Sequence, residues 1–288
     1  MTFKFIHTAD LHLGSRLHTT GEADSFVEKE INESIEKSFK KICDTALRED
    51  IDFIIISGDL YDSEERSINA VSVFNEEAKK LNNDNIDIYV IAGNHDPYKG
   101  KKDILKVPEN VHIFSSNQVE IKEIRNENNN LMARILGQSY RGNADSRKMY
   151  SFFNTTDNSL FNIALLHTQL DPNNNNYVPC SLNDLKSKDD INYWALGHIH
   201  KRKILNKKNP TIIYPGIPQG RDFGETGLGG AYLVEVDDFK KININFIPTS
   251  TIIWRDEKIK IEENDNKKNI EEIIDLIKEK SKKLKKDY

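Results

Sequence analysis

The sequence predicts an α/β protein, and two patterns indicate this class. Short runs rich in β-branched and aromatic residues, such as residues 53–56 and 89–91, stop at Gly or Asn and are typical of buried strands. Between these runs, apolar residues recur at helical spacing in a charged background. Strands and helices therefore alternate in the first part of the chain, as they do in β-α-β crossovers.

Two helices are expected between the first three strands. Apolar residues recur at helical spacing from Phe26 to Leu47, which predicts a long amphipathic helix that ends at Glu49. Ser67 can cap a second helix, whose apolar face runs to Leu81, by accepting a hydrogen bond from the first turn. The chain thus begins with two β-α-β crossovers.

The rest of the chain consists mostly of strands. Residues 119–124 and 131–136 flank an Asn-rich turn at residues 126–130, and this pattern predicts a hairpin. Further strands are expected at residues 163–166, 193–196, 211–214, 232–236 and 242–247.

Length and composition fit one large domain with a small appendage. The 288 residues can bury a substantial core, and 30% charged residues is ordinary for a soluble protein. We expect a main domain at residues 1–250 and a C-terminal extension at residues 251–288. In this extension, two strand-like pieces that begin at Ile252 lead to a Lys/Glu-rich helix with one Ile-lined face.

The expected location is the cytoplasm, without membrane contact. No apolar stretch approaches the roughly 18 residues of a membrane helix, and the chain passes from Met1 directly into a strand. Cys43 and Cys180 lack a CxxC spacing, so they predict inert thiols and neither a disulfide framework nor a thiolate metal site.

Polar clusters stand where the apolar runs end. In open α/β sheets, ligands bind beyond the carboxyl ends of the strands, so these side chains are expected to share one site. A mixture of carboxylate, amide and imidazole donors suits transition-metal ions of borderline hardness. The seven candidate ligands are Asp10, His12, Asp59, Asn94, His167, His198 and His200.

The number of donors predicts two metal ions. Seven ligands are too many for one catalytic ion that keeps a position open for water, whereas two ions roughly 3.5–4 Å apart would use them all. Asp59 is the natural bridge, because a carboxylate has two oxygens and a histidine offers a metal one lone pair. His95 remains as a proton donor or a partner of phosphate oxygens. His7, His18 and His112 belong to no such cluster and are expected to be structural.

Taken singly, the clusters have common explanations. Gly93-Asn94 is a frequent turn pair, Asp10 could cap a helix, and a lone histidine such as His167 is more often part of a core or a turn. Their joint occurrence in one order, each at a strand end, favours the metal site.

An ordered series of motifs carries a resemblance: TADLHLG, SGDLYDS, AGNHD, LLHT and LGHIH, followed by YPGIPQGR. The chain resembles the calcineurin-like metallophosphoesterase superfamily, and within it the SbcD-type DNA-repair exonucleases, from about Phe5 to Phe246. The resemblance implies a four-layer α-β-β-α sandwich of two mixed sheets with the metals at one end. It also implies that His95 is the catalytic histidine. It assigns Asp10, His12, Asp59 and His200 to one ion, and Asp59, Asn94, His167 and His198 to the other.

Two details bear on the branch of the superfamily. Asp62 stands where some nucleases of this type have a second active-site histidine. Protein phosphatases of the superfamily typically read GDxVDRG and GNHE, whereas this chain reads GDLYDS and GNHD, which argues against that branch.

The resemblance also implies partners. Relatives of the SbcD type continue into a capping domain that contacts DNA and a coiled-coil ATPase of the SbcC type. We therefore expect residues 251–288 to be either the start of such a domain or a charged helix that packs on the main domain. A homodimer is one assembly that the sequence allows.

Charge limits the DNA prediction. The formal net charge of −5 argues against an overall basic surface. Local basic clusters follow two of the metal motifs, at residues 99–102 and 201–203, and are interpreted either as guides for a phosphate backbone or as solvated loops. We expect Lys99, Lys201 and Arg221 to contact the substrate.

The sequence therefore predicts a two-metal phosphodiesterase that uses Mn²⁺ and hydrolyses DNA, as an exonuclease or endonuclease in repair. Two alternatives stay open. One is a phosphodiesterase or phosphatase that acts on small nucleotides. The other is a noncatalytic partner-binding module, against which the complete ligand set argues.

Overall fold

The chain divides into two compact units, residues 1–254 and residues 255–288. The structure is a computed structural model, and the larger unit contains every strand among the residues that it describes. The described residues are 2–19, 25–62, 67–98, 107–126, 128–155, 157–171, 175–256, 258 and 270–284.

The first sheet is mixed and has the strand order β12-β11-β1-β2-β3-β4. Strands β1 to β4 run parallel, and β11 and β12 add an antiparallel pair beside β1. The parallel strands carry the first motifs at their carboxyl ends. The strands are β1 (Phe3–Thr8), β2 (Phe53–Ser57), β3 (Asp87–Ile91), β4 (Val111–Ile113), β11 (Gly230–Val236) and β12 (Ile242–Pro248).

The second sheet is also mixed and has the order β5-β6-β7-β8-β10-β9. The expected hairpin is confirmed, because β5 and β6 pair antiparallel across the Asn-rich turn. β9 was not expected from the sequence, and it takes Lys203 into an edge strand that pairs antiparallel with β10. The strands are β5 (Glu120–Arg125), β6 (Leu131–Gly137), β7 (Phe161–His167), β8 (Tyr193–Gly197), β9 (Lys203–Asn206) and β10 (Thr211–Tyr214).

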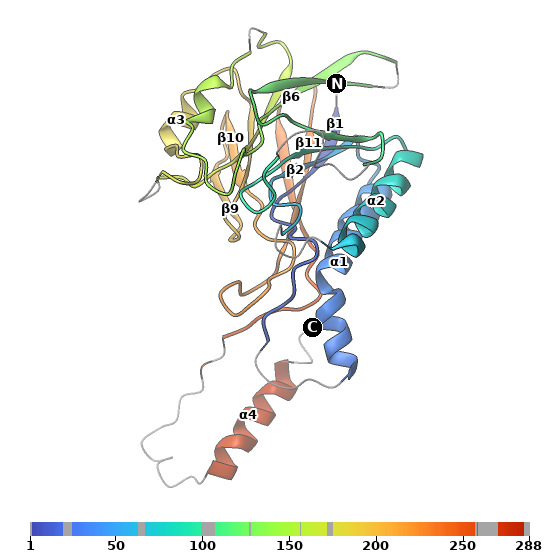
Figure 1. Ribbon diagram of the computed structural model, residues 1–288, viewed down its shortest axis with the longest axis vertical. Coiled ribbons are helices and arrows are strands. Elements are labelled where there is room, and N and C mark those ends of the chain that lie inside the picture. The colour runs from blue at the N-terminus through green and yellow to red at the C-terminus, as the bar shows by residue number, and fades with distance from the viewer. Residues whose placement is uncertain are drawn as a thin grey trace. The chain divides into compact units, whose positions relative to one another are not determined.

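Helices lie outside the two sheets, which makes four layers (Figure 1). α1 (Ser25–Arg48) and α2 (Ile68–Asn83) pack on the first sheet, and Ser67 caps α2 as predicted, since its side chain accepts a hydrogen bond from Ala70 N at 3.1 Å. The short helix α3 (Leu182–Lys186) and the 3₁₀ turn η2 (Met149–Phe152) cover the second sheet. The predicted four-layer α-β-β-α fold is confirmed.

The core between the sheets is aromatic. Phe5 stacks on Phe53 with ring centroids 5.2 Å apart, and the edge of Tyr193 from the second sheet meets Phe5 at 5.3 Å. These rings are fully or almost fully buried. Aromatic side chains bury large apolar areas, so this cluster holds the two sheets face to face and fixes the distance between their strand ends.

The segment after β12 differs from the expectation. Residues 252–256 form no strand, although strand-like pieces were predicted there; residues 257 and 259–269 lie outside the described part of the chain. The reason lies in hydrogen bonding, because the N–H groups of Thr251 and Ile252 donate to the side-chain oxygen Oε1 of Gln219 rather than to a neighbouring strand. In the smaller unit, α4 (Ile270–Leu284) is the Lys/Glu-rich helix that was expected.

Among the described residues, no helix is long and apolar enough to cross a membrane.

The aromatic core generates a prediction for stability. Phe5→Ala removes the ring that contacts both sheets, so the free energy of unfolding should fall by about 3–5 kcal/mol, as is usual for a buried aromatic residue. Phe239→Ala is the matched control, because Phe239 is 92% exposed and its loss should cost little. Urea unfolding of both variants measures the difference, and equal midpoints would contradict this role of Phe5.

Candidate metal centre

The seven predicted ligands lie at the carboxyl ends of strands from both sheets. Asp10 and His12 follow β1, Asp59 follows β2, and Asn94 follows β3. The remaining three come from the second sheet. His167 ends β7, while His198 and His200 follow β8.

Backbone strain is concentrated at these ligands. Four of them have a positive φ, which is uncommon for residues other than glycine: Asp10 (54°), His12 (46°), Asp59 (50°) and His198 (96°). Such conformations cost free energy and persist only where the surrounding structure enforces them. The strand ends are therefore bent sharply, and the bends turn the side chains toward one another.

Backbone hydrogen bonds enforce these bends. The loops after β1 and β2 are joined by Asp10 N to Gly58 O at 3.0 Å and by His12 N to Asp59 O at 3.0 Å. Two glycines leave the necessary room. A Cβ at Gly58 would overlap the ring of His167, and a Cβ at Gly93 would overlap the carboxylate of Asp59. The motif glycines thus let backbone and ligands approach closely.

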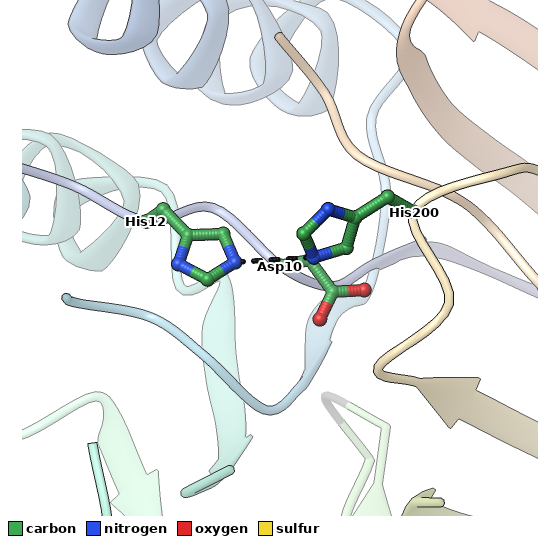
Figure 2. Close-up of side chains that lie close together, drawn as sticks. All are labelled: Asp10, His12 and His200. Carbon is green, nitrogen blue, oxygen red and sulfur yellow. Dashed lines mark hydrogen bonds between the residues drawn. The ribbon is translucent and has the colours of Figure 1, made fainter. Parts of the chain in front are cut away.

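The first set of ligands centres on two histidines (Figure 2). Nε2 of His12 lies 3.3 Å from Nε2 of His200, and Asp10 completes a group whose ligand atoms all lie within 4.8 Å of one another. Glu225 Oε1 lies 2.5 Å from Nδ1 of His200 and accepts a hydrogen bond from it. Because Nδ1 of His200 carries the proton, its Nε2 presents a lone pair toward His12.

The second set centres on His167. Its Nδ1 donates to the carbonyl oxygen of Ser57 at 2.8 Å. Its Nε2 lies 3.0 Å from Oδ1 of Asn94 and 3.3 Å from Oδ2 of Asp59. Oδ1 of Asn94 is also 3.0 Å from Nδ1 of His198. In the neutral ring with its proton on Nδ1, the form that a cation would bind, Nε2 and the two oxygens around it are all acceptors.

Asp59 lies between the two sets. Its Oδ2 is 3.3 Å from Nε2 of His167 and 3.9 Å from Nε2 of His12, while its Oδ1 accepts a hydrogen bond from the backbone N–H of His95 at 2.9 Å. A carboxylate held in this way faces both sets with one oxygen. This placement suits the bridging role predicted for Asp59, which stays a prediction.

Burial and neighbouring charges shift the pKa values of the carboxylates and imidazoles at the centre, in a pattern that favours additional positive charge. Burial raises the pKa of Asp10 to about 6. Burial opposes ionisation of Asp59 too, but His167 and His12 hold its pKa well below the usual range. Burial lowers the pKa of His167, but the carboxylates of Asp59 and Asp10 raise it. The net result is a pKa of about 9. By contrast, burial lowers the pKa of His198 to about 3.

These features fit two divalent cations. Acceptor atoms point at one another around Nε2 of His167 and around the facing nitrogens of His12 and His200, and only a shared proton or a cation makes such contacts favourable. Carboxylate, amide and imidazole donors suit a transition-metal ion. The ligand assignment stays a prediction, and the geometry supplies a place for each set.

His95 lies beside the ligands and is 40% exposed, unlike them. The sequence left open that its neighbour Asp96 orients its ring. The structure gives that contact to Asp62, whose Oδ1 lies 3.3 Å from Nδ1 of His95. Asp96 instead accepts hydrogen bonds from the backbone N–H groups of Gly93 and Leu60, at 2.8 Å each, and so fixes the turn.

The predicted substrate residues differ in their surroundings. Arg221 reaches the site, with Nη1 3.8 Å from Oδ2 of Asp62 and Nη2 3.2 Å from Oε1 of Glu225. Lys201 is exposed and lines a cleft of about 310 Å³ together with His200. Lys99 lies outside the described residues, as do Lys101 and Lys102.

Two other basic residues serve the fold rather than a phosphate. The guanidinium of Arg202 lies over the ring of Phe246, 3.9 Å from its centroid. Arg147 pairs with Asp145 through both carboxylate oxygens and donates to the carbonyl of Ser116 at 2.7 Å. Arg202 is the middle residue of the basic run 201–203, so its contact with Phe246 argues against that run as one continuous guide for a phosphate backbone.

Sequence reasoning missed two residues of the site. The Glu225 carboxylate accepts hydrogen bonds from Nδ1 of His200 and from the backbone N–H of Arg221. Burial raises the pKa of Glu225, but His200 and Arg221 lower it, and the net result is a pKa of about 2. The ring of Tyr177 lies over His198 with centroids 4.7 Å apart. Both residues come from loops after the motifs, and nothing in their spacing signals a contact. Only the Gly-rich flanks of Glu225 marked its loop as one of close approach.

The remaining histidines are structural, as expected, where the contacts are described. His7 is buried, its Nδ1 lies 2.9 Å from the hydroxyl of Tyr193, and burial lowers its pKa to about 3. His112 pairs with Asp87 at 3.2 Å.

Comparison with known proteins decides the family. The family model of calcineurin-like phosphoesterases matches residues 3–202. The chain belongs to this family. It is therefore a metallophosphoesterase, and the resemblance found in its motifs is confirmed.

Three relatives place it more closely. The chain is 35% identical to the uncharacterized metallophosphoesterase YhaO of Bacillus subtilis, over 98% of this chain and 68% of that protein. It is 32% identical to a DNA double-strand break repair protein Mre11 of Methanococcus maripaludis, over 97% of this chain and 76% of that protein. It is 25% identical to one of the subunits of the nuclease SbcCD of Staphylococcus epidermidis, over 85% and 69% respectively. These similarities agree with the SbcD-like branch.

The position of Asp59 generates a prediction for metal content. Asp59→Asn removes the shared carboxylate, so both ions should bind more weakly, whereas His12→Ala should mainly affect one. Elemental analysis after equilibration with Mn²⁺ should give about two ions per chain for the wild type and about one for His12→Ala, as the two ligand sets require. Wild-type occupancy in Asp59→Asn would remove the bridging assignment.

Proposed function

We propose that this protein is a two-metal phosphodiesterase that cleaves DNA. The observation that carries the proposal is the convergence of two ligand sets on Asp59, with the exposed His95 beside them. Seven donors and a nearby acid are more than a structural ion needs. They suit a centre that must also hold a phosphate and protonate a leaving group.

The chain's own residues would hold the cations in the two sets described above. Asp10, His12, Asp59 and His200 form the first, and Asp59, Asn94, His167 and His198 form the second. We propose Mn²⁺ as the ion, because the set combines hard oxygen and borderline nitrogen donors. When bound, two such cations lower the pKa of a bound water toward neutrality and neutralise charge on the phosphate oxygens.

His95 supplies the proton in this proposal. Asp62 Oδ1 accepts from Nδ1 of His95, which leaves Nε2 for the leaving oxygen of the substrate. The backbone N–H of His95 donates a hydrogen bond to Asp59, which holds His95 beside the ligand that both sets would share. The guanidinium of Arg221 lies 3.8 Å from the other carboxylate oxygen of Asp62, Oδ2, and would contact a nonbridging phosphate oxygen.

The names of the relatives support DNA as the substrate. One relative is named a DNA double-strand break repair protein and another is named as part of a nuclease. Because the second name describes only one component of that nuclease, we propose a separate coiled-coil ATPase of the SbcC type as a partner. We further propose that residues 251–288 begin a capping domain. The homodimer and the cytoplasmic location stay predictions.

A phosphodiesterase or phosphatase for small nucleotides is the second candidate. The net charge of −5 and the engagement of Arg147 and Arg202 within the fold leave few cations for a long backbone. Arg221, moreover, is neutralised by Asp62 and Glu225. A substrate that reaches only the metals would need no further cations.

The role of His95 can be separated from metal binding. His95→Asn should keep both ions but lose turnover by about 10²–10⁴-fold on a substrate with a poor leaving group, as is usual when a general acid is removed. A diester with an acidic leaving group needs less protonation, so its loss should be smaller. Asp62→Asn, which keeps the size of the side chain, should also lose more turnover on the diester with the poor leaving group, but the loss should be smaller than in His95→Asn.

Steady-state kinetics on both diesters, together with metal analysis, measure these effects. Loss of metal in His95→Asn, or an equal penalty on both substrates, would count against a proton donor.

The substrate itself is tested with the metal-loaded protein on duplex DNA, single-stranded DNA, cyclic dinucleotides and a generic diester. Contacts to a DNA backbone release counterions, so binding of the His95→Asn variant to DNA should weaken steeply with salt. Lys201→Ala should lower the slope of log affinity against log salt by about one, while the control Lys79→Ala on α2 should not. A flat salt response beside efficient turnover of a nucleotide would favour the small-molecule enzyme.

A further inference from the structure

A second cavity is lined by none of the seven predicted ligands. Its volume is about 500 Å³, which is within the range of small-ligand sites. It is formed by the segment before β5, the segment after β6, and η2. Its lining includes Asn117, Val119, Gln138, Arg141, Met149 and Phe152.

One residue connects this cavity to the ligands. Tyr140 stands between Gln138 and Arg141 in the chain, and its ring meets the ring of His167 edge-on, with centroids 5.4 Å apart. Its backbone carbonyl accepts a hydrogen bond from Tyr98 N at 3.0 Å, just after the His95 turn. Tyr140 thus contacts a predicted metal ligand through its ring and precedes a lining residue of the cavity, Arg141, in the chain.

The apolar part of the cavity lining includes an aromatic ring that is exposed to solvent. Phe152 is 67% exposed although it follows the buried Met149 in the same turn. An exposed aromatic ring at the edge of a cavity is a stacking surface for another flat ring, and covering it removes apolar area from water. Val119 adds a second apolar wall.

The cavity also carries one uncompensated positive charge. Arg147 is neutralised by Asp145, as described above. The guanidinium of Arg141 instead donates to the carbonyl oxygens of Ser116 and Asn117, at 3.2 and 3.1 Å. Among the described residues, no ion pair joins a carboxylate to this guanidinium, although the backbone N–H of Arg141 donates to Oδ2 of Asp145 at 3.4 Å. Two carbonyls hold its plane still, and its charge is free to attract an anion.

The floor of the cavity holds an unused acceptor. Gln138 is 4% exposed; its Nε2 contacts Ser116 O at 3.4 Å, whereas its Oε1 has no hydrogen-bond partner among the described residues. A buried amide oxygen without a donor costs free energy. An N–H group on the edge of a flat heterocycle in the cavity would satisfy it once the Gln138 side chain turns toward the cavity, because this oxygen is shielded from solvent in the structure.

We propose that this cavity binds one unpaired nucleobase, with the attached phosphate on Arg141. The base would stack on Phe152, place its donor edge toward Gln138, and leave its phosphate to the guanidinium. A cavity of this volume has room for one base. Its role in DNA cleavage rests on the proposed function: it would hold a base of a single strand next to the phosphate that the metals engage.

The first test measures the cavity without the metals. Deoxyadenosine monophosphate, added in the presence of a chelator, should bind the wild-type protein in calorimetry or by shifts of protein NMR signals. Phe152→Ala should weaken binding by at least about fivefold, as the loss of one stacking contact implies. Phe239→Ala, which removes an exposed phenyl elsewhere, should have no effect, and deoxyribose 5-phosphate, which lacks the base, should bind far more weakly. Equal affinity of Phe152→Ala and wild type would overturn the proposal.

The second test uses cleavage of a single-stranded oligonucleotide in which one abasic residue is moved along the chain. With wild-type protein, cleavage at one fixed distance from the abasic residue should fall by at least about fivefold, and in Phe152→Ala that dip should disappear. Both proteins should hydrolyse a small diester equally. A flat scan beside efficient DNA cleavage would overturn the proposal and leave the nuclease intact. If no DNA is cleaved, the nuclease fails, and nucleotide binding to the metal-free protein decides the cavity.

Discussion

The requirement for positive charge around two buried carboxylates governs this structure. Asp10 and Asp59 are almost fully removed from water, and a buried anion is costly unless it is paired. The surrounding imidazoles answer this requirement only in part, because burial keeps His198 and His12 from taking up a proton. Divalent cations would supply the charge that these imidazoles do not. The close approach of acceptor nitrogens and oxygens, which is unfavourable by itself, therefore favours the binding of metal ions.

The fold accepts a local cost to create that close approach. Non-glycine residues in left-handed conformations are each unfavourable, and here they stand side by side at Asp10, His12 and Asp59. Their cost is offset elsewhere, since the aromatic core between the sheets is dense and the helices cover both outer faces. Because each predicted ligand set draws on both sheets, the packing of Phe5 against Tyr193 also sets how closely the members of a set approach one another. Stability and site geometry are thus coupled through the same contacts.

The sequence predicted the parts of the site that are attached to regular structure. Ligands such as Asp59 and His167 stand directly at strand ends, and strand ends are visible as apolar runs that stop at polar residues. The partners of the ligands could not be predicted in this way. Glu225 reaches His200 from a loop 25 residues away, and Asp62 rather than Asp96 meets His95, because loop bending decides both contacts. The same holds for residues 252–256, where the side chain of Gln219 takes the hydrogen bonds that a strand would have used.

The distribution of basic residues gives the centre a particular way to recognise its substrate. Arg221 shares its charge with Asp62 and Glu225, so in the proposed reaction it would orient a phosphate more than attract one from a distance. Long-range attraction would then come mainly from the cations, which act on any phosphodiester alike. Discrimination among phosphodiesters must therefore arise from groups that contact something other than the phosphate. In the proposed function, the Tyr177 ring beside His198 and the Phe152 ring of the proposed base-binding cavity would offer stacking, which distinguishes an unpaired base from a paired one.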